Sequence, residues 1–148
     1  MNLFDILGPV MVGPSSSHTA GAVRIGYVAR HLLKDEPNSV KIGLYGSFAK
    51  TGKGHGTDKA LIAGILDMHP DDMRIPKSFE LAQKAGIDFE FYTLDIRNAH
   101  PNTALIDIVG KSGRKLSVQA SSLGGGRIMV NRLDGIDVNF SAEKPTLI

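Results

Sequence analysis

Thr103-Ala-Leu-Ile-Asp-Ile-Val109 and Lys115-Leu-Ser-Val-Gln-Ala-Ser121 decide the fold class, because apolar and polar side chains alternate along both segments. A period of two is typical of strands that bury only one face. Lys111-Ser112-Gly113 lies between the two segments and predicts a tight hairpin. Residues 128–140 repeat the alternation on both sides of Asp134-Gly135, which predicts a second hairpin. The second half of the chain is therefore expected to form antiparallel strands.

The first half of the chain follows a different period. Apolar residues recur at helical spacing over 22–33, 57–68 and 78–85, and Gly86 is placed to end the last of these helices. One strand is expected among them, over Val40–Tyr45. Together the two halves predict an α/β (α+β) fold, a two-layer sandwich with a mixed, mostly antiparallel sheet and helices on one face.

The composition of the chain argues against several classes of function. The chain has 148 residues, 42% of them hydrophobic, which suffices for one domain with a core. Its 17 basic and 15 acidic side chains nearly cancel and form no basic stripe, so neither nucleic acid nor a membrane surface is expected as a partner. No apolar run approaches the ~20 residues of a membrane span. Met1–Val10 contains Asp5 and no basic residue, so it does not resemble a signal peptide, and a cytoplasmic protein is expected.

The chain contains no cysteine. It therefore forms no disulfide, and it cannot by itself supply thiolate ligands to zinc or to an iron–sulfur cluster. Three histidines, His18, His55 and His100, are expected on loops, and three neutral imidazoles could bind zinc. Their long and irregular spacing argues against this, so no metal site is predicted. His31 and His69 are expected to be surface or capping residues.

The segment Gly13-Pro14-Ser15-Ser16-Ser17-His18-Thr19-Ala20-Gly21 concentrates hydrogen-bonding side chains just ahead of the helix expected at 22–33. Its hydroxyls and its imidazole can bond an anionic ligand, and the free N–H groups of a helix N-terminus would point to the same place. One interpretation is a pocket for a carboxylate, with His18 as acid, base or donor. The other is a serine that caps the helix beside a histidine without a role.

The glycine-rich segment from Gly46 to Asp58 displays His55 between two glycines. Five residues separate Gly46 from Gly52-Lys53, one more than a phosphate-binding Walker loop allows, and Gly54 follows where that loop has Ser or Thr. The glycine spacing also differs from the dinucleotide-binding fingerprint. Two interpretations of this segment are left open. Either its glycines allow the backbone to approach a ligand closely, or His55 is an exposed loop histidine.

Two shorter motifs complete the candidates. In His100-Pro101-Asn102-Thr103, the proline favours an extended backbone at His100, and the amide of Asn102 can both donate and accept. An ordinary turn before a strand is the alternative interpretation. Gly124-Gly125-Gly126 is expected to form a bulge, with a ligand-facing nest of N–H groups as the alternative.

Five motifs follow one another along the chain: Gly8–Ala22, Leu44–Ala49, Gly54–Asp58, His100–Thr103 and Gly124–Gly126. In this order they resemble the beta chain of the two-chain, iron–sulfur-dependent L-serine dehydratases (L-serine ammonia-lyases), and the resemblance covers nearly the whole chain. Single-chain relatives usually have Gly-Pro where this chain has Gly21-Ala22, which favours the two-chain form.

The resemblance implies a fold like that of the allosteric substrate-binding domain of some D-3-phosphoglycerate dehydrogenases. Residues 1–148 would form the serine dehydratase beta domain. In the family an ACT domain follows, and Pro145–Ile148 resembles its first strand. The chain is therefore expected to break off at the start of that domain.

The resemblance also implies a reaction, in which L-serine loses water and then ammonia to give pyruvate. The 4Fe–4S cluster would belong to a partner alpha chain, where an open iron site acts as a Lewis acid on the hydroxyl. This chain would be inactive alone. His55 is expected to take the Cα proton, while His18 and His100 orient the substrate or shuttle protons. The residues expected to hold the carboxylate or ammonium are Ser15, Ser16, Ser17, Thr19 and Asn102.

Two other classes of function remain open from the sequence. A non-catalytic, amino-acid-binding regulatory module would use the same domain to bind an effector. A scaffold would only dock the chain that bears the cluster. As a catalytic subunit, the chain is expected to bind L-serine and to assemble with the alpha subunit, as a homodimer or a heterotetramer.

Overall fold

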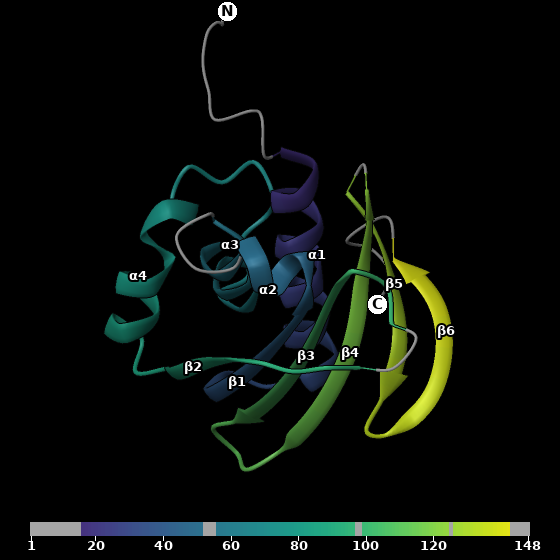
Figure 1. The fold of residues 1–148 in the computed structure, drawn as a ribbon. Coiled ribbons are helices and arrows are strands. Elements are labelled where there is room, and N and C mark those ends of the chain that lie inside the picture. Colours follow the sequence, from purple (N-terminus) through teal and green to yellow (C-terminus); the bar gives the residue numbers. More distant parts are fainter. Residues whose placement is uncertain (1–15, 52–55, 97–98, 125, 143–148) are drawn as a thin grey trace, which may run out of the picture.

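The computed structural model describes residues 16–51, 56–96, 99–124 and 126–142 (Figure 1). Helices occupy Ser16–Leu33 (α1), Ser47–Thr51 (α2), Thr57–Ile65 (α3) and Ser78–Lys84 (α4), with a 3-10 turn at Ile75–Lys77 (η2). The strands are Pro37–Gly46 (β1), Asp88–Thr93 (β2), Asn102–Gly110 (β3), Lys115–Gly124 (β4), Arg127–Leu133 (β5) and Ile136–Ala142 (β6). Helices thus dominate the first half and strands the second, as the change of period predicted.

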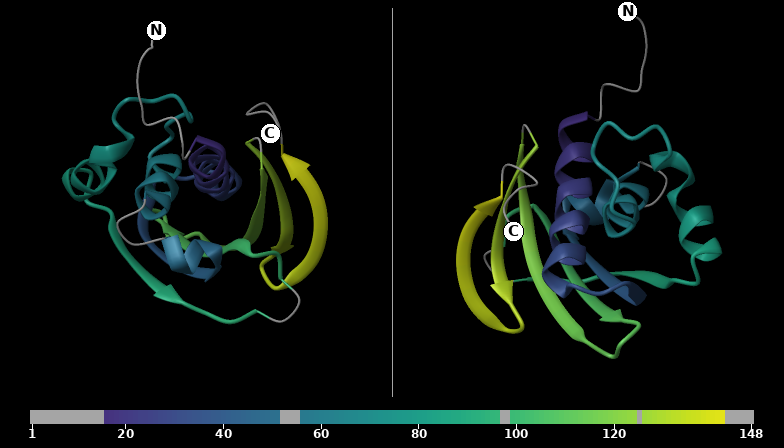
Figure 2. Two further views of the ribbon diagram at one scale, coloured as in Figure 1. Left: turned by 45° about the horizontal axis from the view of Figure 1, so that its top comes forward. Right: turned by 180° about the vertical axis from the view of Figure 1, so that it is seen from behind.

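The described strands form one six-stranded sheet in the order β2-β1-β3-β4-β5-β6. Among these strands β1 and β2 run parallel, and the other neighbouring pairs are antiparallel. Figure 2 shows that the sheet curves around α1 and α3, which lie on its inner face. The predicted two-layer sandwich with a mixed, mostly antiparallel sheet is confirmed.

Both predicted hairpins are confirmed. β3 pairs with β4 across Lys111-Ser112-Gly113, and β5 pairs with β6 across Asp134-Gly135. The backbone φ angles of Asp134 and Gly135 are 52° and 81°. Two consecutive residues in the left-handed region are what a two-residue type I′ turn requires, and this turn follows the natural twist of the strands.

Helix boundaries differ from the prediction in three places. α1 begins at Ser16 rather than near Ala22. Polar residues are compatible with the first turn of a helix, so the polar segment before Ala22 is part of the helix. α2 lies inside the glycine-rich segment and was not predicted, and its fully buried Phe48 anchors it to the core. α3 ends at Ile65, earlier than predicted, because the backbone of Asp67 turns into the left-handed region with a φ of 73°.

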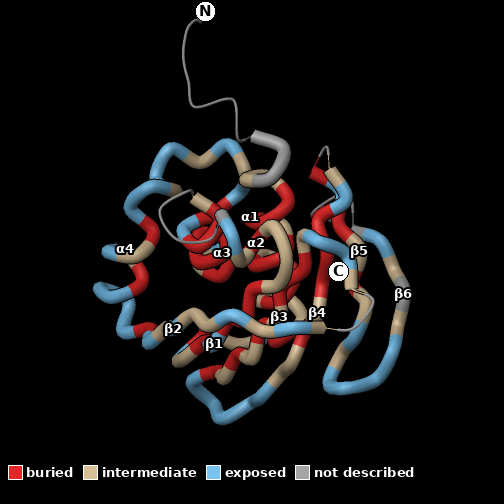
Figure 3. The backbone as a smooth tube through the Cα atoms, in the orientation of Figure 1, coloured by how far each residue is buried: buried red, intermediate tan, exposed pale blue. Residues whose placement is uncertain are grey.

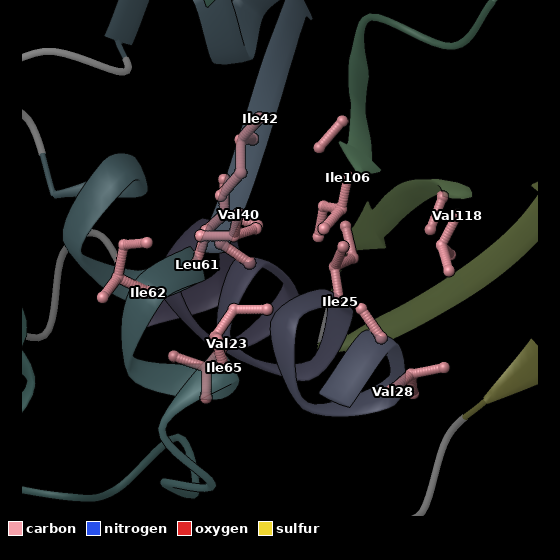
Figure 4. Close-up of a cluster of buried hydrophobic side chains, with 14 of the residues drawn as sticks. Val23, Ile25, Val28, Val40, Ile42, Leu61, Ile62, Ile65, Ile106 and Val118 are labelled. Atoms are coloured by element: carbon pink, nitrogen blue, oxygen red, sulfur yellow. The ribbon is translucent and has the colours of Figure 1, made fainter. Parts of the chain in front are cut away.

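The core lies between the inner face of the sheet and the two central helices. Figure 3 shows buried residues along α1, α3 and the middle strands, whereas the hairpin turns are largely exposed and α4 alternates between buried and exposed residues. In the close-up of Figure 4, Ile25 of α1 points toward Ile106 of β3. Both of these side chains are fully buried. Burial of this apolar layer is what holds the helices to the sheet.

α1 and α3 touch through two glycines. A Cβ atom at Gly26 would collide with the carbonyl oxygen of Leu61. A Cβ atom at Gly64 would collide with the carbonyl oxygen of Val23 and would lie 2.6 Å from the amide nitrogen of Tyr27. The obstacles are backbone atoms of a close-packed helix, which cannot move aside as a flexible side chain could. The two helices can therefore cross this closely only with glycine at both positions.

Candidate functional site

α1 begins at the end of the sheet where β1 finishes at Gly46. Gly21, in the second turn of α1, lies against Ser122 near the finish of β4, and the finish of β4 pairs with the start of β3, which lies opposite Gly46. The N–H groups and positive dipole end at the start of α1 are therefore directed to this end.

The start of β3 and the finish of β4 lie at this end too. Asn102 pairs with Gly46, and the amide of Ser47 donates to the carbonyl oxygen of Pro101 at 2.7 Å. On β4, Ser122 lies so close to Gly21 of α1 that a Cβ atom at Gly21 would collide with the Ser122 hydroxyl. The fold thus brings the first turns of α1 and the His100–Thr103 motif to one edge of the sheet.

Asn102 carries a buried acceptor at this edge. Its side chain belongs to the inner, helix-facing side of β3, because Ala104 and Ile106 follow it at a period of two and both are core residues. Oδ1 of Asn102 is buried and has no hydrogen-bond partner among the described residues. A buried oxygen left without a donor costs about 1–3 kcal/mol. A ligand that donates hydrogen bonds, such as an ammonium group, would remove that cost.

His100 is exposed, but one of its ring nitrogens is already engaged. The backbone amide of Asn102 donates to Nδ1 of His100 at 3.0 Å. A neutral imidazole has one donor and one acceptor nitrogen, so the proton of the neutral His100 ring lies on Nε2. The exposed nitrogen of His100 is therefore a hydrogen-bond donor in its neutral form.

Asp58 is a functional candidate that the sequence reasoning missed. It lies in the first turn of α3 and is only 9% exposed, and its Oδ1 accepts a hydrogen bond from the amide of Lys59 at 2.7 Å. Burial raises the pKa of Asp58 above its ordinary value of 3.8, and the hydrogen bond from Lys59 opposes this only in part. A buried acid directly behind a glycine-rich loop is the signal that could have identified it.

Replacing Asp58 with Asn is expected to raise the free energy of unfolding at neutral pH. A raised pKa in the folded chain means that ionised Asp58 destabilises the fold, and this penalty grows as pH rises from 3.8 through the folded pKa. Below pH 3.8 the penalty is absent, so the variant should gain nothing there. Urea unfolding at neutral and acidic pH measures the difference. Asp71→Asn, on an exposed loop, is the control and should change stability by less than about 0.5 kcal/mol. A less stable Asp58→Asn variant at neutral pH would contradict this reading.

The segment Ser16–Thr19 belongs to the first turn of α1, and Thr19 is half-buried. The prediction that these residues form a loop ahead of the helix is wrong, because the helix includes them. Their backbone nevertheless supplies the helix N-terminus at the edge of the sheet described above. Ser15 and His55 lie outside the described residues, so their predicted roles stay predictions.

The other singled-out motifs have structural explanations. Gly124 ends β4 and pairs with Arg127, the first residue of β5, so the glycines lie at the connection between these strands; the register shift lies just before them, between Ser122 and Gly124, and the predicted bulge at Gly124–Gly126 is not confirmed. His31 bonds Oδ1 of Asp67 through Nε2 at 2.7 Å, and its ring lies 4.1 Å from that of Tyr27. The centre of the His69 ring lies 5.2 Å from the centre of the same tyrosine ring. Both histidines are surface residues at the far ends of α1 and α3, as predicted.

The chain does not fit an iron–sulfur cluster of its own. It has no cysteine, and the described residues contain no group of three or more histidine, aspartate or glutamate side chains that could hold a metal ion. In the described ranges no helix is both long and apolar enough to cross a membrane.

The chain is similar to known proteins over nearly its whole length. Residues 2–87 match the family described as "Serine dehydratase beta chain". The chain is 48% identical over 147 residues to "Probable L-serine dehydratase, beta chain" of Bacillus subtilis (strain 168), which covers 99% of this chain and 66% of the relative. It is 47% identical over 146 residues to "L-serine dehydratase, beta chain" of Peptoniphilus asaccharolyticus, covering 98% and 66% respectively. A shorter match, 43% identical over 81 residues, covers 51% of this chain and 17% of "L-serine dehydratase 2" of Escherichia coli (strain K12). The chain therefore spans about two thirds of the length of its beta-chain relatives.

Proposed function

This chain belongs to the serine dehydratase beta chain family, and we propose that it supplies the substrate-holding part of a site that converts L-serine to pyruvate and ammonia. The remaining part would come from an alpha chain, a partner that the beta-chain names of its relatives imply. The 4Fe–4S cluster expected for this family would be carried by that partner, because this chain offers no thiolate ligand.

The buried Oδ1 of Asn102 carries this proposal. L-serine presents an ammonium group, which would donate to that oxygen, and a carboxylate, which suits the free N–H groups at the start of α1 and the hydroxyls of Ser15–Thr19. Asp58 is a second candidate partner for the ammonium, because a bound cation favours the ionised form of a buried carboxyl. One edge of the sheet would thus recognise both charged groups of a free amino acid.

The chemistry required of this chain is orientation and proton transfer. His55 would take the Cα proton as a neutral base, with His18 and His100 placed to orient the substrate or to pass protons. Loss of the proton and of the hydroxyl leaves 2-aminoacrylate, whose imine tautomer adds water and releases ammonia to give pyruvate. Polarisation of the departing hydroxyl is left to the partner chain.

Anaerobic co-expression with the alpha chain, followed by a pyruvate assay, tests the proposal. Pyruvate should form from L-serine when both chains are present and not from this chain alone. In the complex, Asn102→Ala is expected to raise the KM for L-serine roughly tenfold, as expected when a hydrogen bond to a charged group is lost. Asn38→Ala, at an exposed position of β1, is the control and should leave KM unchanged. Activity from the purified chain alone, or a normal KM for the Asn102 variant, would contradict the proposal.

Calorimetry separates this function from its alternatives. A regulatory module should bind L-serine tightly without the alpha chain, whereas part of a composite site should bind it weakly or not at all. A scaffold should tolerate alanine at His18, His55 and His100 without loss of turnover in the complex.

A further inference from the structure

Three polar side chains form a connected row on the outer face of the sheet, opposite the helices. Oγ1 of Thr103 on β3 and Oγ of Ser121 on β4 lie 2.8 Å apart, and these residues are direct register partners. Oγ of Ser121 also lies 2.8 Å from Oδ1 of Asn131 on β5. Thr103 is fully buried and Ser121 is 2% exposed. We call these three residues the hydroxyl row.

The hydroxyl row ends on the backbone of His100. Thr103 donates its only hydroxyl proton to the carbonyl oxygen of His100 at 2.6 Å. Ser121 also has a single hydroxyl proton, which goes either to Oγ1 of Thr103 or to Oδ1 of Asn131. The hydrogen bond that holds the carbonyl group of His100 is therefore the one from the buried Thr103, and Ser121 packs beside it.

His100 is thus held at two points from two directions. Its carbonyl oxygen is bound by Thr103, and Nδ1 of its ring is bound by the amide of Asn102. Together the two hydrogen bonds close a tight turn around Pro101, which leaves the imidazole few rotamers although it is exposed. They also select the tautomer with the proton on Nε2, because Nδ1 must stay an acceptor.

We propose that Thr103, supported by Ser121 and Asn131, is a positioning residue that fixes the His100 ring as an Nε2–H donor at the substrate edge. The catalytic consequence rests on the proposed function, in which that N–H is aimed at a polar group of the substrate. The tautomer itself does not depend on it. The hydroxyl row therefore acts on the site from the opposite face of the sheet, without touching the substrate.

The test compares Thr103→Val, which removes the hydroxyl at nearly constant shape, with Thr103→Ser, which keeps it. Thr93→Val, at the exposed end of β2, is the matched control. Long-range proton–nitrogen correlation spectra of the chain, at a pH where the ring is neutral, should show a single Nε2–H tautomer for His100 in the wild-type, Thr103→Ser and Thr93→Val chains. Thr103→Val should shift His100 toward a mixture of tautomers.

Activity of the complex with the alpha chain is the second readout. Thr103→Val should lower kcat roughly tenfold with little change in KM, the size expected for losing one hydrogen bond, and Thr103→Ser should restore most of it. An Nδ1–H tautomer in the wild-type chain, or an unchanged His100 spectrum in Thr103→Val, would overturn the proposal. If Thr103→Val does not fold, Thr103→Ala, which also removes the hydroxyl, takes its place, and an unchanged spectrum in that variant overturns it equally. A wild-type complex without lyase activity would refute the proposed function alone, because the spectra decide the positioning role without it.

Discussion

Replacing Gly64 with alanine is expected to destabilise the folded chain by about 3 kcal/mol, the upper range for overpacking a well-packed interior. The added methyl group would meet the backbone of α1 at Val23 and Tyr27, so relief requires the two helices to separate. Separation would open the apolar layer between α1, α3 and the sheet. Alanine is favoured over glycine within a helix by about 1 kcal/mol, which offsets only part of this cost. Chemical denaturation of the chain measures the change.

Gly86→Ala is the matched control for this prediction. Gly86 follows α4 with a φ of 79°, and a Cβ atom there would meet nothing within 4 Å. Its replacement should cost about 1 kcal/mol, from the strained backbone alone. A Gly64→Ala variant as stable as the wild-type chain would show that α1 and α3 can move apart freely, which contradicts the close crossing.

Replacing His55 with alanine is expected to lower turnover of the assembled enzyme about 10²–10⁴-fold, the usual contribution of a general base. The Cα proton of serine is weakly acidic, so elimination without a positioned base should be very slow. KM should change little, because binding is assigned to Asn102 and to the start of α1. Pyruvate formation by the anaerobically assembled complex, with its cluster content verified, measures the effect.

His69→Ala serves as the control for the His55 variant. His69 is exposed and its ring packs beside that of Tyr27, away from the first turn of α1. Its replacement should leave turnover unchanged. Near-normal turnover in His55→Ala would remove His55 from the role of base and direct attention to His18.

The sequence pattern predicted the strands well because their burial is one-sided. Alternation over 103–109 and 115–121 reflects one inner and one outer face, and Asp134-Gly135 encodes its own turn. Two features of the fold could not be predicted from the local sequence pattern. The short helix α2 depends on the burial of Phe48, a tertiary effect, since five residues rarely form a helix by themselves. The parallel pairing of β1 with β2 joins segments that are distant in the chain.

From the sequence, candidate site residues could be proposed only where they are neighbours in the chain. A short motif predicted Asn102 and His100, and their roles stay predictions. Sequence reasoning missed Asp58, because its importance comes from burial rather than from residue type. It also missed the hydroxyl row, because Thr103, Ser121 and Asn131 belong to three strands and meet only when the sheet forms.

Asn102 and Thr103 are consecutive, yet the pleat of β3 sends one side chain inward and the other outward. A mutational survey that ranked positions by distance from the substrate would therefore treat Ser121 and Asn131 as free to vary. Redesign of that face with apolar residues would remove buried polar side chains that have no visible connection to turnover. Selection on His100 should therefore also act on Thr103, Ser121 and Asn131. Sequence variation at these three positions should be restricted to residues that keep their hydrogen bonds.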